Sequence, residues 1–281
     1  MGWLGAHVSI SGGIDKAPSR GKEIGCESIQ IFTKNQRQWY AKPLTQHEIL
    51  AFKSEMINAG LREAVVHDTY LINLASPKTE LFRKSVEAFY GEVVRAEALG
   101  IQYLVFHPGA HMGSGEEVGI NRIAQALNEV LDRTKESRLV VLLETTAGQG
   151  TSLGYRFEQL EDIIDLVEYK DRIAVCFDTS HVFGAGYDLR EEDAYNTTID
   201  EFDAILGLDR LKVIHLNDTR HSLGSRRDVH ENIGEGEIGL EGFRLLVNDR
   251  RFQNVSMILE TPGTEMRDRE NLRILRSLIE S

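Results

Sequence analysis

The chain contains few residues of the kinds that mark cross-linked or membrane-embedded proteins. It has two cysteines and five prolines in 281 residues. Cys26 and Cys176 each lie inside an apolar run, which excludes a disulfide framework or a CxxC zinc module and indicates a reducing compartment. No apolar run approaches the roughly 18 residues of a membrane span, and the N-terminus lacks the pattern of a secretory signal. We therefore expect a cytoplasmic protein without a membrane partner.

Basic residues are also scarce relative to acidic ones. The sequence has 32 Lys and Arg against 44 Asp and Glu, a formal net charge of −12. At face value, this balance argues against nucleic acid or an anionic membrane as a partner. The length suits two average domains or one α/β barrel. Because prolines are few and no Ser/Gly-rich linker is evident, we expect a single domain over residues 1–281.

Short apolar runs alternate with longer amphipathic stretches along the chain. Most of the runs are continuous and rich in β-branched residues, as in parallel strands buried on both faces. The predicted strands are 3–8, 27–33, 64–67, 101–106, 139–144, 173–178, 211–216 and 255–260, and the predicted helices are 45–59, 79–99, 120–135, 156–168, 239–248 and 267–279. About eight strand–helix units predict an α/β fold of the TIM (β/α)8 barrel class, with a doubly wound open sheet as the alternative.

Six consecutive predicted strands end in an acidic or imidazole side chain. In a barrel these C-terminal strand ends meet on one face, where active sites lie. Such groups are costly to bury unless they are paired, ligated or solvated, and few Lys or Arg occupy matching positions. Each residue alone has an ordinary structural explanation, but the repetition indicates a metal centre. The strand-end residues are His67, His107, Glu144, Asp178, His215 and Glu260.

Two further motifs add three candidate ligands. His181 follows Asp178 by three residues, and Asp228 and His230 are separated by one residue, so that in an extended loop both would project from the same side. The nine candidates would fill two or three sites, because a catalytic zinc takes about three protein ligands. Nitrogen and oxygen donors without thiolate favour Zn²⁺ or Mn²⁺.

These motifs resemble endonuclease IV, the family of metal-dependent apurinic/apyrimidinic (AP) endonucleases. The resemblance extends from Gly5 to Glu260 and departs from the family at Thr145, where Asn is usual, and at Ser180, where Cys is common. The matching stretches are 5–9 (GAHVS), 32–39 (FTKNQRQW), 67–74 (HDTYLINL), 106–109 (FHPG), 146–150 (TAGQG), 178–181 (DTSH), 215–218 (HLND), 224–226 (GSR) and 234–236 (GEG).

The resemblance implies a TIM barrel that holds three zinc ions, with Mn²⁺ able to replace some of them. Glu144 would bridge the first and second ions, and Glu144 and Glu260 would be the catalytic carboxylates. The implied ligands are His67, His107 and Glu144 for the first ion, Glu144, Asp178, His215 and Glu260 for the second, and His181, Asp228 and His230 for the third.

The activity implied by the resemblance is hydrolysis of the phosphodiester 5′ to an abasic site in duplex DNA. The products would be a 3′-hydroxyl and a 5′-deoxyribose phosphate, and 3′-blocking groups such as phosphate and phosphoglycolate would also be removed. Zinc would make hydroxide available near neutral pH and stabilise charge on the phosphate.

DNA recognition would depend on loops at the same face. In the family, the equivalents of Arg37, Tyr70 and Leu71 enter the base stack at the lesion, where unstacking costs least. Without the resemblance, ordinary packing beneath a loop would be the preferred interpretation of Tyr70 and Leu71. The candidate DNA-binding residues are Asn35, Gln36, Arg37, Gln38, Tyr70, Leu71 and Arg226.

Bound metal would change what the negative net charge implies about DNA as a partner. Three dications would bring the net charge from −12 to about −6 and would concentrate positive charge at the binding face. We expect further positive charge there from loop residues, namely Lys34, Arg37, Arg220, Arg226 and Arg227. Local field, and not bulk charge, decides whether DNA docks.

Two other functions are compatible with this pattern. A sugar isomerase or epimerase on a related barrel also gathers Glu, Asp and His, but around one or two ions, so His181, Asp228 and His230 favour the nuclease. A metal-stabilised protein that binds DNA lesions without cutting them is a minor alternative. No heptad pattern or exposed apolar stripe demands assembly, so we expect a monomer.

Overall fold

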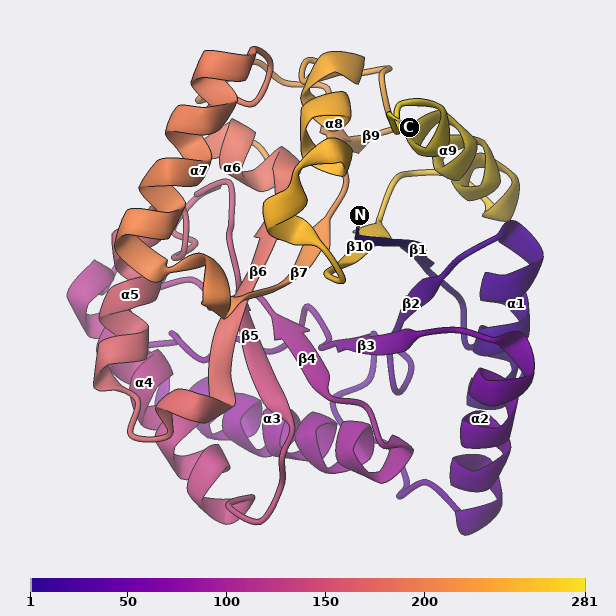
Figure 1. The fold of residues 1–281 in the computed structure, drawn as a ribbon. Coiled ribbons are helices and arrows are strands. Elements are labelled where there is room, and N and C mark those ends of the chain that lie inside the picture. Colours follow the sequence, from indigo (N-terminus) through magenta and orange to yellow (C-terminus); the bar gives the residue numbers. More distant parts are fainter. Residues whose placement is uncertain (1, 281) are drawn as a thin grey trace.

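A closed barrel of eight parallel strands forms the centre of the computed structural model, which describes residues 2–280 (Figure 1). The first strand pairs in parallel with both the second and the last, which closes the barrel and excludes the open sheet. The barrel strands are β1 (Trp3–His7), β2 (Ser28–Ile31), β3 (Glu63–His67), β4 (Tyr103–Phe106), β5 (Val140–Glu144), β6 (Ile173–Asp178), β7 (Leu211–His215) and β10 (Ser256–Leu259). All eight predicted strands are confirmed, with ends that differ by at most two residues.

Helices surround the barrel as an outer ring (Figure 1). Within the described residues they are α1 (Ala17–Ile24), α2 (Gln46–Ala59), α3 (Thr79–Leu99), α4 (Glu116–Arg133), α5 (Phe157–Leu166), α6 (Thr179–Ala185), α7 (Glu192–Leu206), α8 (Gly239–Asn248) and α9 (Glu265–Ser277). The six predicted helices are present, although α4 begins four residues before the predicted start. A capping box between Thr45 and Glu48 fixes the start of α2, and Gly60 ends it in the left-handed conformation, with φ of 70°.

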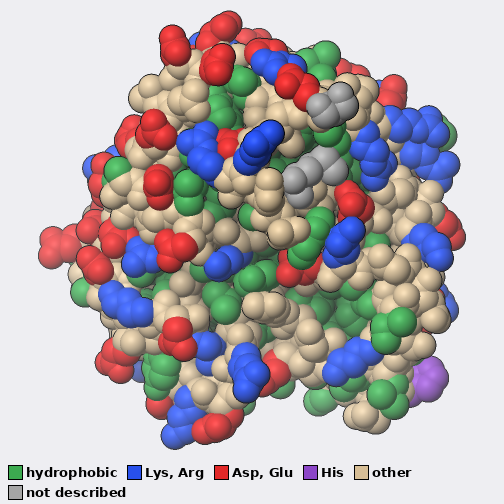
Figure 2. Space-filling model, in the orientation of Figure 1, with side chains coloured by type: hydrophobic (Ala, Val, Ile, Leu, Met, Phe, Trp, Pro, Cys, Tyr) green, Lys and Arg blue, Asp and Glu red, His purple; other side chains and the backbone are tan. Residues whose placement is uncertain are grey.

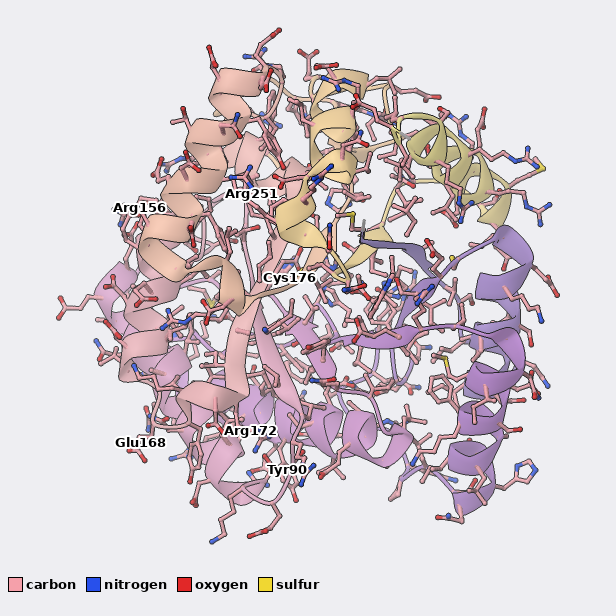
Figure 3. The ribbon with its side chains drawn as sticks, viewed as in Figure 1. Tyr90, Arg156, Glu168, Arg172, Cys176 and Arg251 are labelled. Carbon is pink, nitrogen blue, oxygen red and sulfur yellow. The ribbon has the colours of Figure 1, made fainter. Side chains whose placement is uncertain are left out.

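The barrel interior is filled by apolar side chains and is therefore not a pore. Figure 3 labels one of them, Cys176 on β6, whose burial raises the pKa of its thiol to about 12. The interior cluster comprises Val65, Val105, Leu142, Ala174, Cys176, Val213 and Ile258, all 3% exposed or less. A second apolar layer lies between the strands and the helices. Polar side chains in the barrel are consequently confined to its ends.

A two-stranded antiparallel ribbon lies outside the barrel, formed by β8 (Asp218–Thr219) and β9 (His230–Glu231). It holds the loop between them close to the end of β7.

Acidic and basic side chains are intermingled over the face shown in Figure 2. Among residues 2–280, no helix has the length and apolarity that a membrane crossing requires.

Candidate metal centre

One layer of side chains at the C-terminal end of the barrel receives a residue from every strand. Because side chains on a strand alternate, a residue two positions beyond an interior residue also points into the barrel. Val65 thus precedes His67, Leu142 precedes Glu144, and the same spacing holds at the ends of β4, β6, β7 and β10. The resulting layer consists of His7, Gln30, His67, His107, Glu144, Asp178, His215 and Glu260.

The structure brings the predicted ligands together in three groups, in each of which one ligand atom per residue lies within 4.8 Å of the others. Asp228 is outside these groups but adjoins the third, with its Oδ1 3.1 Å from His181 Nε2 and 3.6 Å from His230 Nε2. The groups are His67, His107 and Glu144; Glu144, Asp178, His215 and Glu260; and Asp178, His181 and His230. Side chains from residues 67 to 260 therefore surround one compact centre.

Glu144 occupies the middle of this centre and is fully buried at the end of β5. Its Oε2 lies 3.0 Å from His67 Nε2 and 3.2 Å from His107 Nε2. Its Oε1 lies 3.2 Å from His215 Nδ1 and 3.1 Å from His181 Nδ1. The two oxygens of one carboxylate thus face different groups, which is the arrangement that a shared ligand requires.

Backbone carbonyls fix the orientation of the imidazole rings. The Nδ1 atom of His67 donates to the carbonyl of Asp68 at 2.8 Å, and that of His181 donates to the carbonyl of Thr145 at 2.8 Å. A carbonyl oxygen only accepts hydrogen bonds, so each Nδ1 carries a proton, and in the neutral ring that binds a metal each Nε2 presents a lone pair to the centre. Such an outer hydrogen bond is typical of metal-binding histidines.

The charges in this centre lack basic partners. Among the described residues, no lysine or arginine nitrogen lies within 4.0 Å of the carboxylates that form the groups. Burial opposes ionisation of Glu144, but the His107 and His215 rings hold the pKa of its carboxyl well below the ordinary range. Burial also disfavours charge on His67, yet the hydrogen bond and charge of Glu144 raise the pKa of that imidazole to about 9. Without metal, protons on imidazoles therefore supply the positive charge that a dication would supply.

The centre is closed on one side and open on the other. The side chain of His215 is 0% exposed, whereas those of His107 and Asp228 are 31% and 39% exposed. A cavity of about 210 Å³ adjoins the open side, lined in part by Tyr70, His107 and Asp228. A substrate would reach the ligands from this side.

Two buried amides contact the ligands but were not predicted from the sequence. The Nε2 of Gln30 donates to Glu260 Oε1 at 2.6 Å. The Nδ2 of Asn217 donates to Asp178 Oδ2 at 2.7 Å, and its Oδ1 accepts from the backbone N–H of Glu260 at 2.8 Å. A glutamine inside the apolar run of β2, in register with the ligand layer, is the signal that could have identified Gln30.

Thr145, one of the two residues that depart from the family pattern, forms hydrogen bonds to the same network. The Oγ1 of Thr145 accepts from the backbone N–H of Asp178 at 2.9 Å, and the Thr145 carbonyl holds His181. His7 also adjoins the site, since its Nδ1 accepts from Gln30 Nε2 at 3.1 Å. Ser180, the other departure, is fully buried and its hydroxyl has no partner.

The predicted DNA-contacting residues lie on exposed loops. Asn35, Gln36, Arg37 and Gln38 are all exposed, and the turn is closed by a bond from Gln38 N to the Asn35 carbonyl. Tyr70 is 59% exposed, and its ring centroid lies 5.6 Å from that of His67 and 5.8 Å from that of His107.

The other two candidates differ in their environment. Leu71 is half-buried beside Tyr70. Arg226 is exposed and has a left-handed backbone, with φ of 54°, and its guanidinium carbon lies 4.5 Å from the Tyr155 ring centroid. The separate loops that carry these candidates leave their side chains accessible to a large partner.

Lys34 does not add positive charge to this face, which corrects the sequence-based expectation. Its side chain is buried and forms an ion pair with Glu92 of α3, because that buried carboxylate requires a cation. Thr33 Oγ1 donates to Glu92 Oε2 at 2.6 Å, and Arg95 donates to the Lys42 carbonyl at 2.6 Å. The base of the 33–42 loop is consequently anchored to α3.

Comparisons with known proteins agree with this geometry. The family model described as "Xylose isomerase-like TIM barrel" matches residues 19–278. The chain is 52% identical to the probable endonuclease 4 of Chloroflexus aggregans, over 98% of this chain and 97% of that protein. The crystal structure of endonuclease IV from Thermus thermophilus superposes with a TM-score of 0.87 at 36% identity, over 98% of both chains. A D-tagatose 3-epimerase-like protein shares only the fold, with a TM-score of 0.77 at 18% identity over 98% of this chain and 96% of that chain. The chain therefore belongs to the endonuclease IV family of xylose isomerase-like TIM barrels.

Proposed function

We propose that this protein is a zinc-dependent AP endonuclease of DNA repair. It hydrolyses the phosphodiester 5′ to an abasic site in duplex DNA, leaves a 3′-hydroxyl and a 5′-deoxyribose phosphate, and removes 3′-blocking groups. The observation that carries the proposal is the sharing of the Glu144 carboxylate between two ligand groups, beside a third group around His181 and His230. The names of the relatives support the same reaction.

Three zinc ions per chain fit the donors present, and Mn²⁺ could replace some of them. The donors are imidazole nitrogens and carboxylate oxygens without thiolate, and they lack lysine or arginine partners among the described residues. When bound, the ions would make hydroxide available near neutral pH and offset the charge of a phosphodiester. The nine ligands would be His67, His107, Glu144, Asp178, His181, His215, Asp228, His230 and Glu260.

Glu144 and Glu260 are the carboxylates closest to the reaction in this proposal. Burial opposes their ionisation, yet nearby imidazoles keep the pKa of each below its ordinary range. Both would stay ionised at neutral pH, so they act by holding positive charge in place and not as proton donors. Glu260 is itself held by the backbone through Asn217 and by the amide of Gln30.

The exposed loops would recognise the DNA. Arg37, Tyr70 and Leu71 would enter the stack at the lesion, because their side chains are planar or apolar and Tyr70 lines the cavity at the open side of the centre. The polar residues Asn35, Gln36, Gln38 and Arg226 would contact the backbone. The whole chain of 281 residues would act as one catalytic unit and as a monomer.

One experiment separates this function from sugar epimerisation on the same fold. Metal content would be measured on the purified protein, which would then be given an oligonucleotide duplex with one abasic site and, separately, a ketohexose. We expect about three zinc ions per chain and a single nick 5′ to the lesion. One ion per chain with ketose turnover would establish the epimerase instead, and lesion binding without a nick would indicate a non-enzymatic protein.

A further inference from the structure

Gln30 lies in the ligand layer without being a predicted ligand. It is fully buried on β2, with its side chain between Glu260 and His215. Its Nε2 donates to Glu260 Oε1 at 2.6 Å, and its Oε1 lies 2.8 Å from His215 Nε2. One neutral side chain thus contacts two members of the second ligand group.

The chemistry of these contacts fixes the orientation of the amide. An ionised carboxylate only accepts hydrogen bonds, so Glu260 requires the amino group of Gln30 on its side. The amide oxygen must then face His215, and this oxygen can only accept. His215 must therefore donate, which places its proton on Nε2.

In the neutral ring that binds a metal, the opposite nitrogen of His215 is left with a lone pair. That atom, Nδ1, lies 3.2 Å from Glu144 Oε1, 3.3 Å from Glu260 Oε2 and 3.6 Å from Asp178 Oδ2. It is consequently the nitrogen available to a metal ion. The other tautomer would direct an N–H group toward the position of a cation and would leave the oxygen of Gln30 without a donor.

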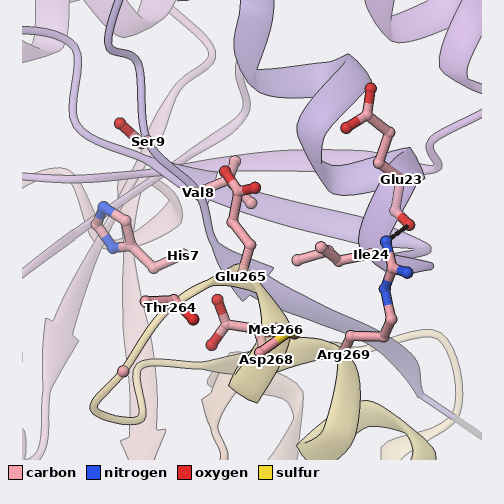
Figure 4. A pocket seen from close by; sticks show the side chains of 11 residues that line it. His7, Val8, Ser9, Glu23, Ile24, Thr264, Glu265, Met266, Asp268 and Arg269 are labelled. Carbon is pink, nitrogen blue, oxygen red and sulfur yellow. Dashed lines mark hydrogen bonds between the residues drawn. The ribbon is translucent and has the colours of Figure 1, made fainter.

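The second N–H of the amide is also used. It points to His7 Nδ1 at 3.1 Å, which leaves the proton of that ring on Nε2. His7 stands at the edge of a cavity of about 640 Å³ between β1, α1 and α9 (Figure 4), yet its Nε2 is buried and has no partner. Both N–H groups and the oxygen of the Gln30 amide therefore have partners inside the ligand layer, so the side chain is held in one rotamer.

We propose that Gln30 is a positioning residue that selects the tautomer of His215 and holds Glu260, so that both present their free atoms to the second metal ion. The proposal rests on the metal centre proposed above. It predicts that removal of the amide weakens one metal ion selectively, by about 10- to 100-fold, and leaves the other two in place.

The test uses Gln30→Met, which keeps the size and the unbranched shape of the side chain but removes its donors and acceptor. The matched control is Ser28→Ala, because Ser28 lies two residues earlier on the same side of β2 and its hydroxyl donates to the Trp3 carbonyl, at 2.9 Å, and not to a ligand. Zinc retained against a graded series of chelator concentrations would be counted for both variants and for the unmodified protein. We expect one ion to be lost early from Gln30→Met and three to be retained by Ser28→Ala.

A second measurement does not depend on the folding of a variant. Nitrogen-15 NMR of the zinc-loaded, unmodified protein reports which ring nitrogen of His215 carries the proton, and we expect Nε2. A proton on Nδ1, or wild-type zinc affinity in Gln30→Met, would overturn the positioning role. An unmodified protein that retains no zinc would instead overturn the metal centre itself.

Discussion

The Nε2 atoms of His181 and His230 face each other at 3.4 Å. Each ring is held from behind, since His181 Nδ1 donates to the Thr145 carbonyl and His230 Nδ1 donates to the Glu260 carbonyl at 3.1 Å. In the neutral rings two lone pairs would face each other and repel, and a cation bound by both nitrogens would offset this repulsion. The pair is thus preorganised for an ion.

Replacement of His230 should remove one ion from the centre. We expect His230→Ala to retain two zinc ions per chain and to lose at least about 100-fold in abasic-site cleavage, more than is usual for loss of an outer partner of a ligand. Metal analysis and a nicking assay would measure these effects. His221→Ala is the control, because this half-buried histidine lies in the loop after β8, outside the ligand groups. Three ions in His230→Ala would contradict the assignment.

Metal removal should destabilise the folded protein. The centre joins residues at the ends of six barrel strands with residues of α6 and β9, and its charges are largely buried, so zinc binds the folded state in preference to the unfolded one. Zinc at 100 times its Kd contributes about 2.7 kcal/mol, so chelation should lower the Tm by about 5 °C or more. Calorimetry with and without chelator would measure the shift, and added zinc should restore the Tm. A Tm that does not respond would exclude a structural contribution from the metal.

The hydroxyl of Thr145 should contribute to the stability of the folded protein. In Thr145→Val the backbone N–H of Asp178, which now donates to Thr145 Oγ1 at 2.9 Å, would be buried without an acceptor. We expect a loss of about 1–3 kcal/mol in the free energy of unfolding, measured by urea denaturation. Thr145→Ser keeps the acceptor and should lose much less. Equal stability of the two variants would show that the bond contributes nothing.

Asp268 should make the protein more stable in mild acid. Burial, followed by the charge of Glu265, raises the pKa of this carboxyl from 3.8 to about 6. The folded state therefore binds the proton more tightly, and this contribution to stability falls as pH rises from about 4 to 6 and stays lost above. Asp268→Asn should raise the Tm by about 2 °C or more at pH 7.5 and leave it unchanged at pH 4. Equal gains at both pH values would contradict the assignment of the effect to this titration.

Arg37 and Leu71, which are proposed to enter the base stack, should contribute to the binding of damaged DNA only. We expect Arg37→Ala and Leu71→Ala to weaken binding to abasic duplex by about 10-fold and to change binding to intact duplex little, because the stack opens most easily at the lesion. Fluorescence anisotropy with both duplexes would show the difference. Lys135→Ala, an exposed lysine after α4, is the control. Equal losses on both duplexes would instead indicate ordinary phosphate contacts.

The barrel could be predicted because its strands are short and continuously apolar, and its long helices carry apolar stripes. Three helices were not predicted. The first, α1, contains Pro18 and Gly21 within eight residues. Helix α6 follows β6 without a turn, and His181 was the residue in it that was interpreted as a ligand. In α7, acidic and threonine residues obscure the apolar stripe formed by Ile199, Phe202 and Leu206.

The ligands could be predicted for a topological reason, since a barrel places the ends of all strands together. Gln30 and Asn217 were missed. The position of Gln30 inside an apolar run marked it as unusual, but an amide carries no sign of the partner that it meets, and Asn217 had no such mark. Lys34 was placed wrongly because Glu92, the residue that draws it inward, lies 58 positions away in the sequence. Pairings of this kind depend on packing between distant elements.

The anchoring of the 33–42 loop to α3 has a consequence for genetics. Glu92 and Arg95 sit on an outer helix, yet they hold the base of a loop whose tip is exposed at the barrel mouth. A selection for altered tolerance of DNA damage should therefore recover substitutions in α3 at residues that do not contact DNA. Second-site substitutions that suppress them should occur at Thr33 and Lys34.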